Sequence, residues 1–370
     1  MVKYLVVGAG ISGATIANCI SQDVKNTIDV IDKHPYVGGN CYDYLDKSGI
    51  TIHNCGSHIF HTNSKEIWEY VHLFSPFNSY KHRVLVIIEG HGVPLPFSLI
   101  TLHKVLPDTV ADTIERKLLA CYPYGSSIPI RNLMTHLDDD LSFITQFIYE
   151  KIFLHYTEKQ WGKSPEDVDA SITARVPIVL NRDAHYFQDT YQGIPICGYT
   201  EMIRRMLDRP NITISLNTGF KDINNLEEYD RIFFTGPVDE LMDYQLGVLP
   251  YRSERFVLET HNCVFYQEVA VVNYPNGEDF TRIHEYKHYL NDKSPVTVIA
   301  KEYPEEFVPG KNEPYYPVPG KENEELHRKY IELAQKKYPN MVFLGRLGDY
   351  KYYNMDQAVA RAMEVAKEYM

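Results

Sequence analysis

The N-terminal hydrophobic pattern predicts a strand, a helix and a second strand. Residues 3–7 (KYLVV) form a short apolar run that stops at Gly8, as a buried parallel strand would. Residues 11–22 follow with apolar and small side chains spaced for a closely packed helix. Residues 27–31 (TIDVI) form another apolar run that ends before Asp32. We therefore expect a β-α-β unit that opens a Rossmann-like domain.

The pattern changes in the middle of the chain. The segment 98–169 lacks strand alternation and contains helical stretches, so we expect a mostly helical insertion there. Later segments rich in Val, Ile, Phe, Tyr and Thr predict antiparallel strands, namely residues 176–197, 252–274, 282–289 and 296–303. Near the C-terminus, residues 341–347 return to strand character, and residues 355–369 predict a helix with one apolar face.

These elements place the chain in the α/β class, as an α+β multi-domain protein. We expect a discontinuous Rossmann-like domain, an inserted helical domain and an antiparallel β-sheet domain. The expected Rossmann-like domain comprises residues 1–80, 199–245 and 325–370. The helical insertion covers residues 98–172, and the sheet domain covers residues 81–97, 173–198 and 246–324.

Composition narrows the classes of ligand. The chain has 370 residues, with 44% hydrophobic and 23% charged positions, as ordinary globular proteins do. Its net charge of -12 argues against binding to nucleic acid or to anionic membranes, which requires a basic surface. An anionic ligand would need positive charge gathered locally. The 29 tyrosines could stack on planar ligands and bond phosphate or sugar oxygens, although most belong to cores and interfaces.

Cysteine and histidine usage argues against disulfides and metals. The six cysteines are scattered without a C-x-x-C pair, as in reduced cytoplasmic proteins. The first residues are too weakly apolar for a signal peptide, and no apolar stretch approaches 18 residues, so we expect no membrane insertion. His53, His58 and His61 lie close in sequence but lack carboxylate or cysteine partners at suggestive spacing, so we expect no metal site.

A glycine motif follows the first predicted strand. In GAGISG, Gly8 permits a tight turn, Gly10 lets a pyrophosphate approach the backbone, and Gly13 permits close helix packing. The N–H groups at the start of the helix would hold phosphates. Asp32 ends the second strand, where it could bind ribose hydroxyls. The doublet Gly38-Gly39 permits another close approach to a dinucleotide and favours FAD over NAD.

Longer motifs identify a family. The segments that carry the resemblance are HYTEKQWG (155–162), YFQDTYQGIP (186–195), GYTEMI (198–203), TGPVDE (235–240), LPYRSERF (249–256), FTRIHEYKH (280–288), KEYP (301–304), EPYYPV (313–318) and GRLGDYKYYNMDQ (345–357). In this order and across essentially the whole chain, they resemble the bacterial UDP-galactopyranose mutases.

That resemblance implies an isomerase of nucleotide sugars. The family interconverts the pyranose and furanose forms of UDP-galactose, and supplies the furanose for cell-surface polysaccharides. It requires reduced FAD, whose N5 forms a covalent adduct with the anomeric carbon C1 while UDP departs and returns. The resemblance further implies a cytoplasmic homodimer, with NAD(P)H or another reductant for the flavin and no nucleic-acid partner.

The family's site residues carry over onto matching positions. The catalytic residues would be Arg175 and Arg282, which hold the diphosphate, and His58. The substrate would contact His82, Phe153, Tyr156, Thr157, Trp161, Tyr186, Asn273, Tyr316 and Tyr352. FAD would contact Gly8, Gly10, Ser12, Gly13, Asp32, Lys33, Gly39, Asn40, His58, Ile59, Arg346, Tyr353, Asn354 and Met355. In the family, Trp161 and Arg175 flank a mobile loop, which corresponds here to residues 162–171.

Departures from the family pattern leave the sugar and the nucleobase open. Cys55-Gly-Ser-His58 replaces Tyr-Gly-Pro/Ala-His, Ala174 replaces Lys, Val179 replaces Arg, His82 replaces Asn, and Asn354 replaces Asp. Asn354 should still cap the last helix, because Asn caps about as well as Asp. The same chemistry on dTDP-fucopyranose or UDP-N-acetylgalactosamine is therefore an alternative. A flavin oxidoreductase of amine-oxidase-like architecture and a non-catalytic nucleotide-sugar-binding relative are two further alternatives.

Overall fold

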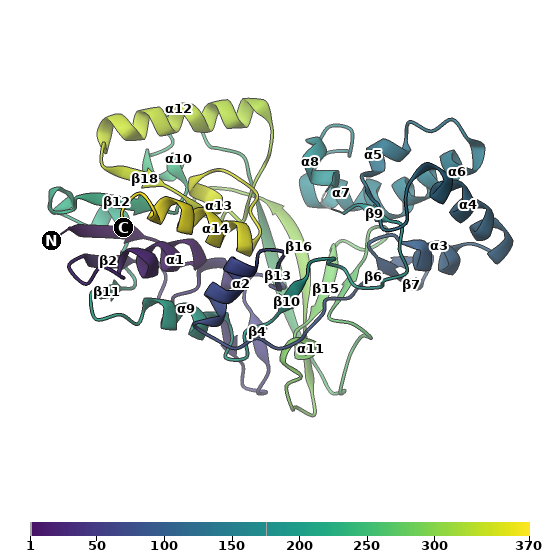
Figure 1. Ribbon diagram of the computed structural model, residues 1–370, viewed down its shortest axis with the longest axis horizontal. Coiled ribbons are helices and arrows are strands. Elements are labelled where there is room, and N and C mark those ends of the chain that lie inside the picture. Colours follow the sequence, from purple (N-terminus) through teal and green to yellow (C-terminus); the bar gives the residue numbers. More distant parts are fainter. Residues whose placement is uncertain (1, 175) are drawn as a thin grey trace.

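The computed structural model describes residues 2–174 and 176–370, and a five-stranded parallel sheet forms the part of the molecule that holds both ends of the chain (Figure 1). The strands run in the order β11-β2-β1-β12-β18. Their bounds are Ile212–Ser215, Thr27–Ile31, Lys3–Val7, Arg231–Phe234 and Met341–Phe343. Each pair is parallel, so the predicted β-α-β opening of a Rossmann-like domain is confirmed.

Alternation along β1 assigns a helical layer to each face of this sheet. Tyr4 and Val6 pack with α1 (Ile11–Ile20), α9 (Tyr199–Leu207) and α14 (Met355–Ala366). Leu5 points to the other face and packs with α10 (Val238–Leu241) and α12 (Lys321–Lys337). Both faces are therefore buried, as a parallel sheet requires.

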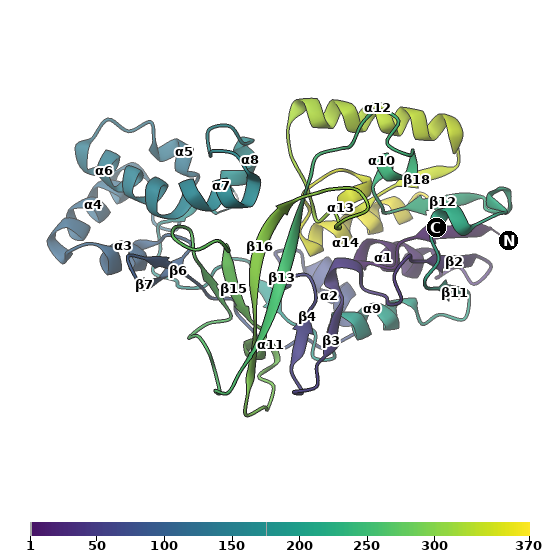
Figure 2. The same ribbon diagram turned by 180° about the vertical axis from the view of Figure 1, so that it is seen from behind.

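A second, seven-stranded sheet occupies the middle of the molecule (Figure 2). Its strands run in the order β17-β13-β16-β15-β14-β6-β7. Their bounds are Tyr316–Pro317, Tyr251–His261, Thr297–Glu306, Arg282–Glu285, Val271–Asn273, Val84–Ile88 and His91–Leu95. All neighbours pair antiparallel except β14 and β6, which are parallel. The long pair β13–β16 runs alongside the Rossmann-like part (Figure 2).

Helices α3 to α8 form a separate layer beyond the far end of this sheet (Figure 1). Their bounds are Leu99–Val105, Asp108–Cys121, Ile130–Leu133, Asp139–Ile148, His155–Trp161 and Ala170–Ala174. A π-helical stretch, Tyr149–Leu154, joins α6 to α7 without a break. Such widened turns re-aim the side chains that follow them, and here α7 carries four residues of the site described below.

Short elements connect these layers. They are β3 (Asp43–Leu45), β4 (Thr51–His53), β5 (Phe60–Thr62), α2 (Lys65–His72), β8 (Ser127–Ile128), β9 (Ile178–Val179), β10 (Tyr191–Gly193), α11 (Lys287–Leu290) and α13 (Gly345–Gly348). Single 3-10 turns cover Gly39–Cys41, Phe220–Asp222 and Leu226–Glu228. Among the described helices, none combines the length and apolar character that a membrane crossing needs.

Several predicted strands were too long. Segment 176–197 holds only β9 and β10, and the irregular backbone between them brings Tyr186 and Phe187 into the wall of the cavity described below. Segment 252–274 divides into β13 and β14. Segment 282–289 leaves strand geometry after Glu285, whose buried carboxylate accepts hydrogen bonds from the N–H groups of Tyr266 and Gln267. The strand predicted for 341–347 ends at Phe343, and the last helix ends at Ala366.

Candidate active site

The glycine motif forms a cradle of bare backbone at the start of α1. A Cβ on Gly13 would lie 1.9 Å from the carbonyl oxygen of Gly8, and one on Gly8 would lie 2.1 Å from Thr235 Oγ1. Gly8 also has a φ of +105°, which favours glycine. The N-terminus of α1 is thereby kept open for an anionic group, which its N–H groups and dipole favour.

The second glycine doublet lies directly against this cradle. The Gly38 N–H donates to the Ala9 carbonyl at 2.9 Å, and a Cβ on Gly39 would lie 3.1 Å from Gly10 Cα. Asp32 accepts from the Ala9 N–H at 2.8 Å and from the His34 N–H at 2.9 Å. Burial raises the pKa of Asp32, but the hydrogen bonds from His34 and Ala9 lower it further, so its net shift is downward.

These loops fit a dinucleotide, because side chains would fill the space that they keep free. A Cβ on Gly345, whose φ is +84°, would lie 3.0 Å from Ser12 Oγ. The C-terminal segment therefore also lies against the cradle, so three segments meet here. Lys33 forms an ion pair with Glu313 at 2.9 Å, and Asn40 lies in the 3-10 turn after Gly38. Contact of Asp32 with a ribose remains a prediction.

A cavity of about 570 Å³ lies next to the cradle, between the seven-stranded sheet and the helical layer. It brings together these residues predicted from the sequence: His58, Ile59, His82, Phe153, Tyr156, Thr157, Trp161, Tyr186, Asn273, Arg282, Tyr316, Arg346, Tyr352, Asn354 and Met355. Outside the cavity lining stand Gly8, Gly10, Ser12, Gly13, Asp32, Lys33, Gly39, Asn40 and Tyr353. Arg175 lies outside the described residues.

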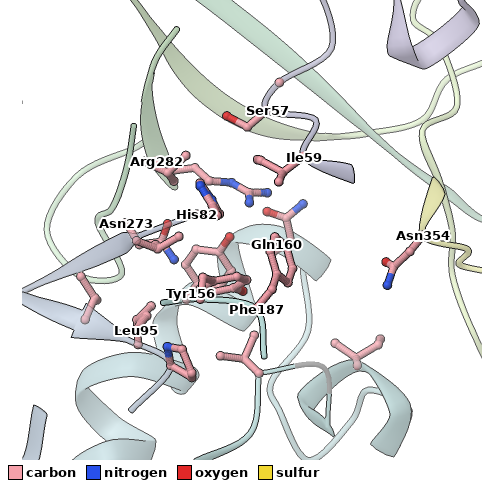
Figure 3. A pocket seen from close by; sticks show the side chains of 18 of the residues that line it. Ser57, Ile59, His82, Leu95, Tyr156, Gln160, Phe187, Asn273, Arg282 and Asn354 are labelled. Carbon is pink, nitrogen blue, oxygen red and sulfur yellow. The ribbon is translucent and has the colours of Figure 1, made fainter. Parts of the chain in front are cut away.

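Arg282 faces the cavity from β15 (Figure 3). Its Nε donates to Glu302 Oε1 at 2.7 Å, across the directly paired position of β16. Among the described residues this is the only hydrogen bond that the Arg282 side chain makes, so the remaining guanidinium N–H groups can donate to a ligand. The forked geometry of these groups suits phosphate oxygens.

Glu302 is held as a carboxylate by several donors. Besides Arg282, it accepts from Thr281 Oγ1 at 2.9 Å and from His284 Nε2 at 2.8 Å. Burial alone would raise the pKa of Glu302, but the charge of Arg282 and the bond from His284 lower it to about 2. His284 in turn hydrogen-bonds Ser57, and Ser57 hydrogen-bonds Tyr289. These polar groups hold Glu302 in position, and Glu302 in turn fixes the guanidinium of Arg282.

A second carboxylate, Glu254, comes from β13, the strand next to that of Glu302 in the sheet. Its Oε1 accepts from Gln160 Nε2 at 2.9 Å and lies 3.9 Å from Arg282 Nη2. Only 2% of its side chain is exposed. Burial and the charge of Glu302 raise the pKa of Glu254 to about 8. The sequence reasoning missed Glu254, Glu302, His284, Ser57 and Gln160, although polar residues at alternate positions of β15 are a signal for a polar strand face.

Arg346 supplies a second guanidinium to the cavity. It donates to the Tyr353 carbonyl at 2.7 Å and lies over the rings of Tyr316 and Tyr352, at 5.1 and 5.7 Å from their centroids. It forms no ion pair with a carboxylate of the described residues. Its positive charge therefore remains available to an anion. The two tyrosine rings hold it in place through cation–π contacts.

Three histidines, His53, His58 and His82, lie in or beside the cavity wall. Burial lowers the pKa of His53, His58 and His82 to about 3 each, and nearby positive groups add to the effect. The His58 N–H donates to His53 Nδ1 at 3.1 Å, and the Tyr80 hydroxyl lies 3.1 Å from His82 Nδ1. The described residues contain no group of three His, Cys, Asp or Glu side chains that could hold a metal ion.

Two amide oxygens lack partners in the cavity wall. Gln160 Oε1 and Asn273 Oδ1 are buried without a hydrogen-bond partner among the described residues. Figure 3 shows Gln160, Tyr156, His82 and Arg282 gathered on one side of the cavity, with Asn354 across from them. Asn354 occupies the N-cap position of α14, as predicted, and its N–H donates to Gln357 Oε1 at 2.9 Å. A ligand with hydroxyl donors would satisfy the unpaired oxygens.

Comparison with known proteins connects this geometry to a family. Residues 151–352 match the family model described as UDP-galactopyranose mutase, and residues 6–74 match the NAD(P)-binding Rossmann-like domain. The dTDP-fucopyranose mutase of Escherichia coli is 32% identical, over 100% of this chain and 99% of its own length. The probable UDP-galactopyranose mutase of Klebsiella pneumoniae is 36% identical, over 100% of this chain and 94% of its own length.

The fold agrees with these matches. A crystal structure of reduced UDP-galactopyranose mutase superposes with a TM-score of 0.75 at 15% identity, and the match covers 100% of this chain and 93% of that one.

Proposed function

Because this chain belongs to the UDP-galactopyranose mutase family, we propose that it is an isomerase that interconverts the pyranose and furanose forms of a nucleoside-diphosphate sugar. The observation that carries this function is the cavity in which Arg282 and Arg346 face the same space as Tyr156, Tyr316 and Tyr352. An acidic protein thereby gathers positive charge and neutral hydroxyls where a diphosphate would lie.

The cofactor is FAD, as the Rossmann-like domain and the family imply. The glycine cradle at the start of α1 would hold its pyrophosphate, and Arg346, His58 and Met355 would lie against its ring system. In the reduced state, FAD would supply the electron pair that attacks the anomeric carbon of the sugar, and this covalent chemistry is part of the proposal.

The residues of this chain would bind, orient and stabilise. Breaking the bond between the anomeric carbon and the diphosphate leaves negative charge on the phosphate oxygens, and Arg282 would stabilise it with the N–H groups that Glu302 does not occupy. Tyr156, Tyr186, Tyr316 and Tyr352 would donate hydroxyl hydrogen bonds to the same oxygens. Asn273 and Gln160 would accept from ligand hydroxyls, because each has a buried unpaired oxygen. Arg175 completes the proposed set.

The test is turnover by the FAD-loaded protein after reduction with dithionite. UDP-galactopyranose, dTDP-fucopyranose and UDP-N-acetylgalactosamine are incubated side by side, and the furanose products are separated by HPLC. We expect conversion of at least one sugar nucleotide by the reduced enzyme and none by the oxidised enzyme. Absence of any furanose product from fully reduced, FAD-loaded protein refutes the proposal, and dye reduction with an amine substrate would support an oxidoreductase instead.

The finer expectations also stand as proposals. We propose that the enzyme is a cytoplasmic homodimer with the three-domain division given above, that NAD(P)H or another reductant reduces its flavin, and that its product enters cell-surface polysaccharide. Light scattering tests the dimer, and anaerobic flavin bleaching by NADPH tests the reductant.

A further inference from the structure

Two buried carboxylates share one guanidinium in the cavity wall. Glu254, Glu302 and Arg282 come from β13, β16 and β15, three consecutive neighbours in the sheet. Glu254 stands two residues before Phe256, the register partner of Glu302, so both carboxylates project from the same face. All three residues line the cavity.

Their hydrogen bonds are unequal, and this decides which carboxylate is ionised. Glu302 accepts from a guanidinium, an imidazole and a hydroxyl. Glu254 accepts from one neutral amide, that of Gln160, and the Arg282 guanidinium is 3.9 Å away. Two buried carboxylates that share one guanidinium resist ionising together, so Glu302, which has more and stronger hydrogen-bond donors, keeps the charge and Glu254 keeps the proton.

We propose that Glu254 holds a proton in the free site and that an anionic nucleotide sugar binds at Arg282 only with this proton in place. The inference rests on the proposed function. When Glu254 is protonated, the charges of Arg282 and Glu302 cancel, so the diphosphate binds next to a cluster with no net charge. With Glu254 ionised, the cluster is negative and repels a doubly charged diphosphate in a site of low dielectric. Glu254 is therefore a positioning residue that sets the charge of the diphosphate subsite through Arg282.

Glu254 is surrounded by other ionisable groups, and their pKa values decide which group titrates between neutral and weakly basic pH. Two further guanidinium groups act on Glu254 through their charge, those of Arg346 and Arg252. The phenols of Tyr156, Tyr315 and Tyr316 and the thiol of Cys55 all have pKa values raised by burial. Burial lowers the pKa of His284, and Glu302 titrates in acid. Among the described residues around Arg282, Glu254 alone has a pKa of about 8.

The experiment measures protons taken up on binding. The oxidised FAD holoenzyme, which does not turn over, is titrated calorimetrically with UDP-galactose and with dTDP-fucose in buffers of different ionisation enthalpy, at pH 6.5 and pH 8.5. The diphosphate diester of either ligand does not titrate in this range. We expect almost no uptake at pH 6.5 and roughly 0.8 proton per ligand at pH 8.5, the ionised fraction of an acid with a pKa of about 8.

The variant Glu254→Gln keeps the shape and cannot ionise, so it should bind at both pH values without proton uptake. In turnover, the wild-type kcat/KM should fall about tenfold per pH unit above pH 8, and that of Glu254→Gln should stay level. Glu305→Gln is the matched control, because Glu305 lies on β16 at the surface, paired with Arg255. This control should retain the wild-type uptake, and flavin absorbance confirms that each variant is loaded.

The outcomes separate the two proposals. Binding of either ligand without proton uptake at pH 8.5 overturns the role of Glu254 and leaves the proposed function standing. Unchanged uptake in Glu254→Gln assigns the proton to another group and likewise overturns the inference. Failure of the wild-type holoenzyme to bind any of the nucleotide sugars refutes the proposed function itself.

Discussion

Replacing Gly13 by Ala tests the dinucleotide cradle. The new Cβ would lie 1.9 Å from the Gly8 carbonyl oxygen and 3.3 Å from Val6 Cγ1. The turn and the helix must separate by at least 1.1 Å to reach 3.0 Å, the shortest contact that a Cβ tolerates. Two effects on folding oppose each other: the helix gains about 1 kcal/mol when Ala replaces Gly, and overpacking costs about 1–3 kcal/mol.

The net loss of folding free energy is therefore at most about 2 kcal/mol. For a chain of 370 residues, unfolding entropy of about 2.1 cal/mol/K per residue makes this a shift in Tm of less than about 3 °C. The loss of FAD should be larger, because each displaced hydrogen bond to a charged phosphate costs about 1.5–3 kcal/mol. We expect the Kd for FAD to rise at least 10-fold.

The assay is the ratio of flavin to protein absorbance after gel filtration, followed by titration of the apoprotein with FAD. Gly277→Ala is the matched control, since Gly277 has no atom within 4 Å of its added Cβ and no left-handed φ. The control should keep the wild-type flavin content. A Gly13→Ala protein that binds FAD within twofold of the wild-type Kd would refute the reasoning, and FAD would then lie elsewhere.

Three further predictions concern the cavity. Arg282→Lys should lower kcat/KM by about 100-fold in the HPLC assay, because an ammonium lacks the planar fork that bonds Glu302 and phosphate oxygens together. Unchanged turnover would contradict the role given to Arg282. His284→Phe removes a hydrogen-bond donor from buried Glu302, so the free energy of unfolding should fall by about 1–3 kcal/mol and the Tm by about 1–4 °C. An unchanged Tm would show that Glu302 does not depend on His284. The pKa of His82 is about 3 in the folded protein and about 6.5 in the unfolded chain. The folded protein therefore loses stability as the pH falls below 6.5. His82→Asn should therefore lose about 2 kcal/mol less than wild type between pH 7 and pH 5 in urea denaturation, and parallel losses would rule this out.

Local patterns were enough to predict the Rossmann-like opening. The signals for this opening lie within one short segment, where residues close in sequence are also close in space. They are the alternation of Tyr4, Leu5 and Val6, the glycines of the first turn, and Asp32. The family motifs likewise placed Arg282, Tyr156 and Tyr316 in one cavity. Their chemical roles remain predictions.

The charge arrangement behind Arg282 could not be predicted in the same way. Glu254, Arg282 and Glu302 are separated in the chain and meet only because β13, β16 and β15 pair in register. Ser57 reaches the same cluster from the loop between β4 and β5. The strands predicted for 176–197 and 282–289 were too long because β propensity does not report where a backbone turns away to contact a cavity or a buried carboxylate.

The order of strands in the parallel sheet has a consequence for biosynthesis. The cradle opens at Gly8, but Gly345 covers Ser12 and α14 packs against α1. The strand β18 joins the sheet beside β12 only once residue 343 has been made. A chain that is still shorter than this lacks the segments that close the cradle, so we expect it to hold FAD weakly. A chain interrupted before β18 would also leave β12 as an unpaired sheet edge, which favours aggregation.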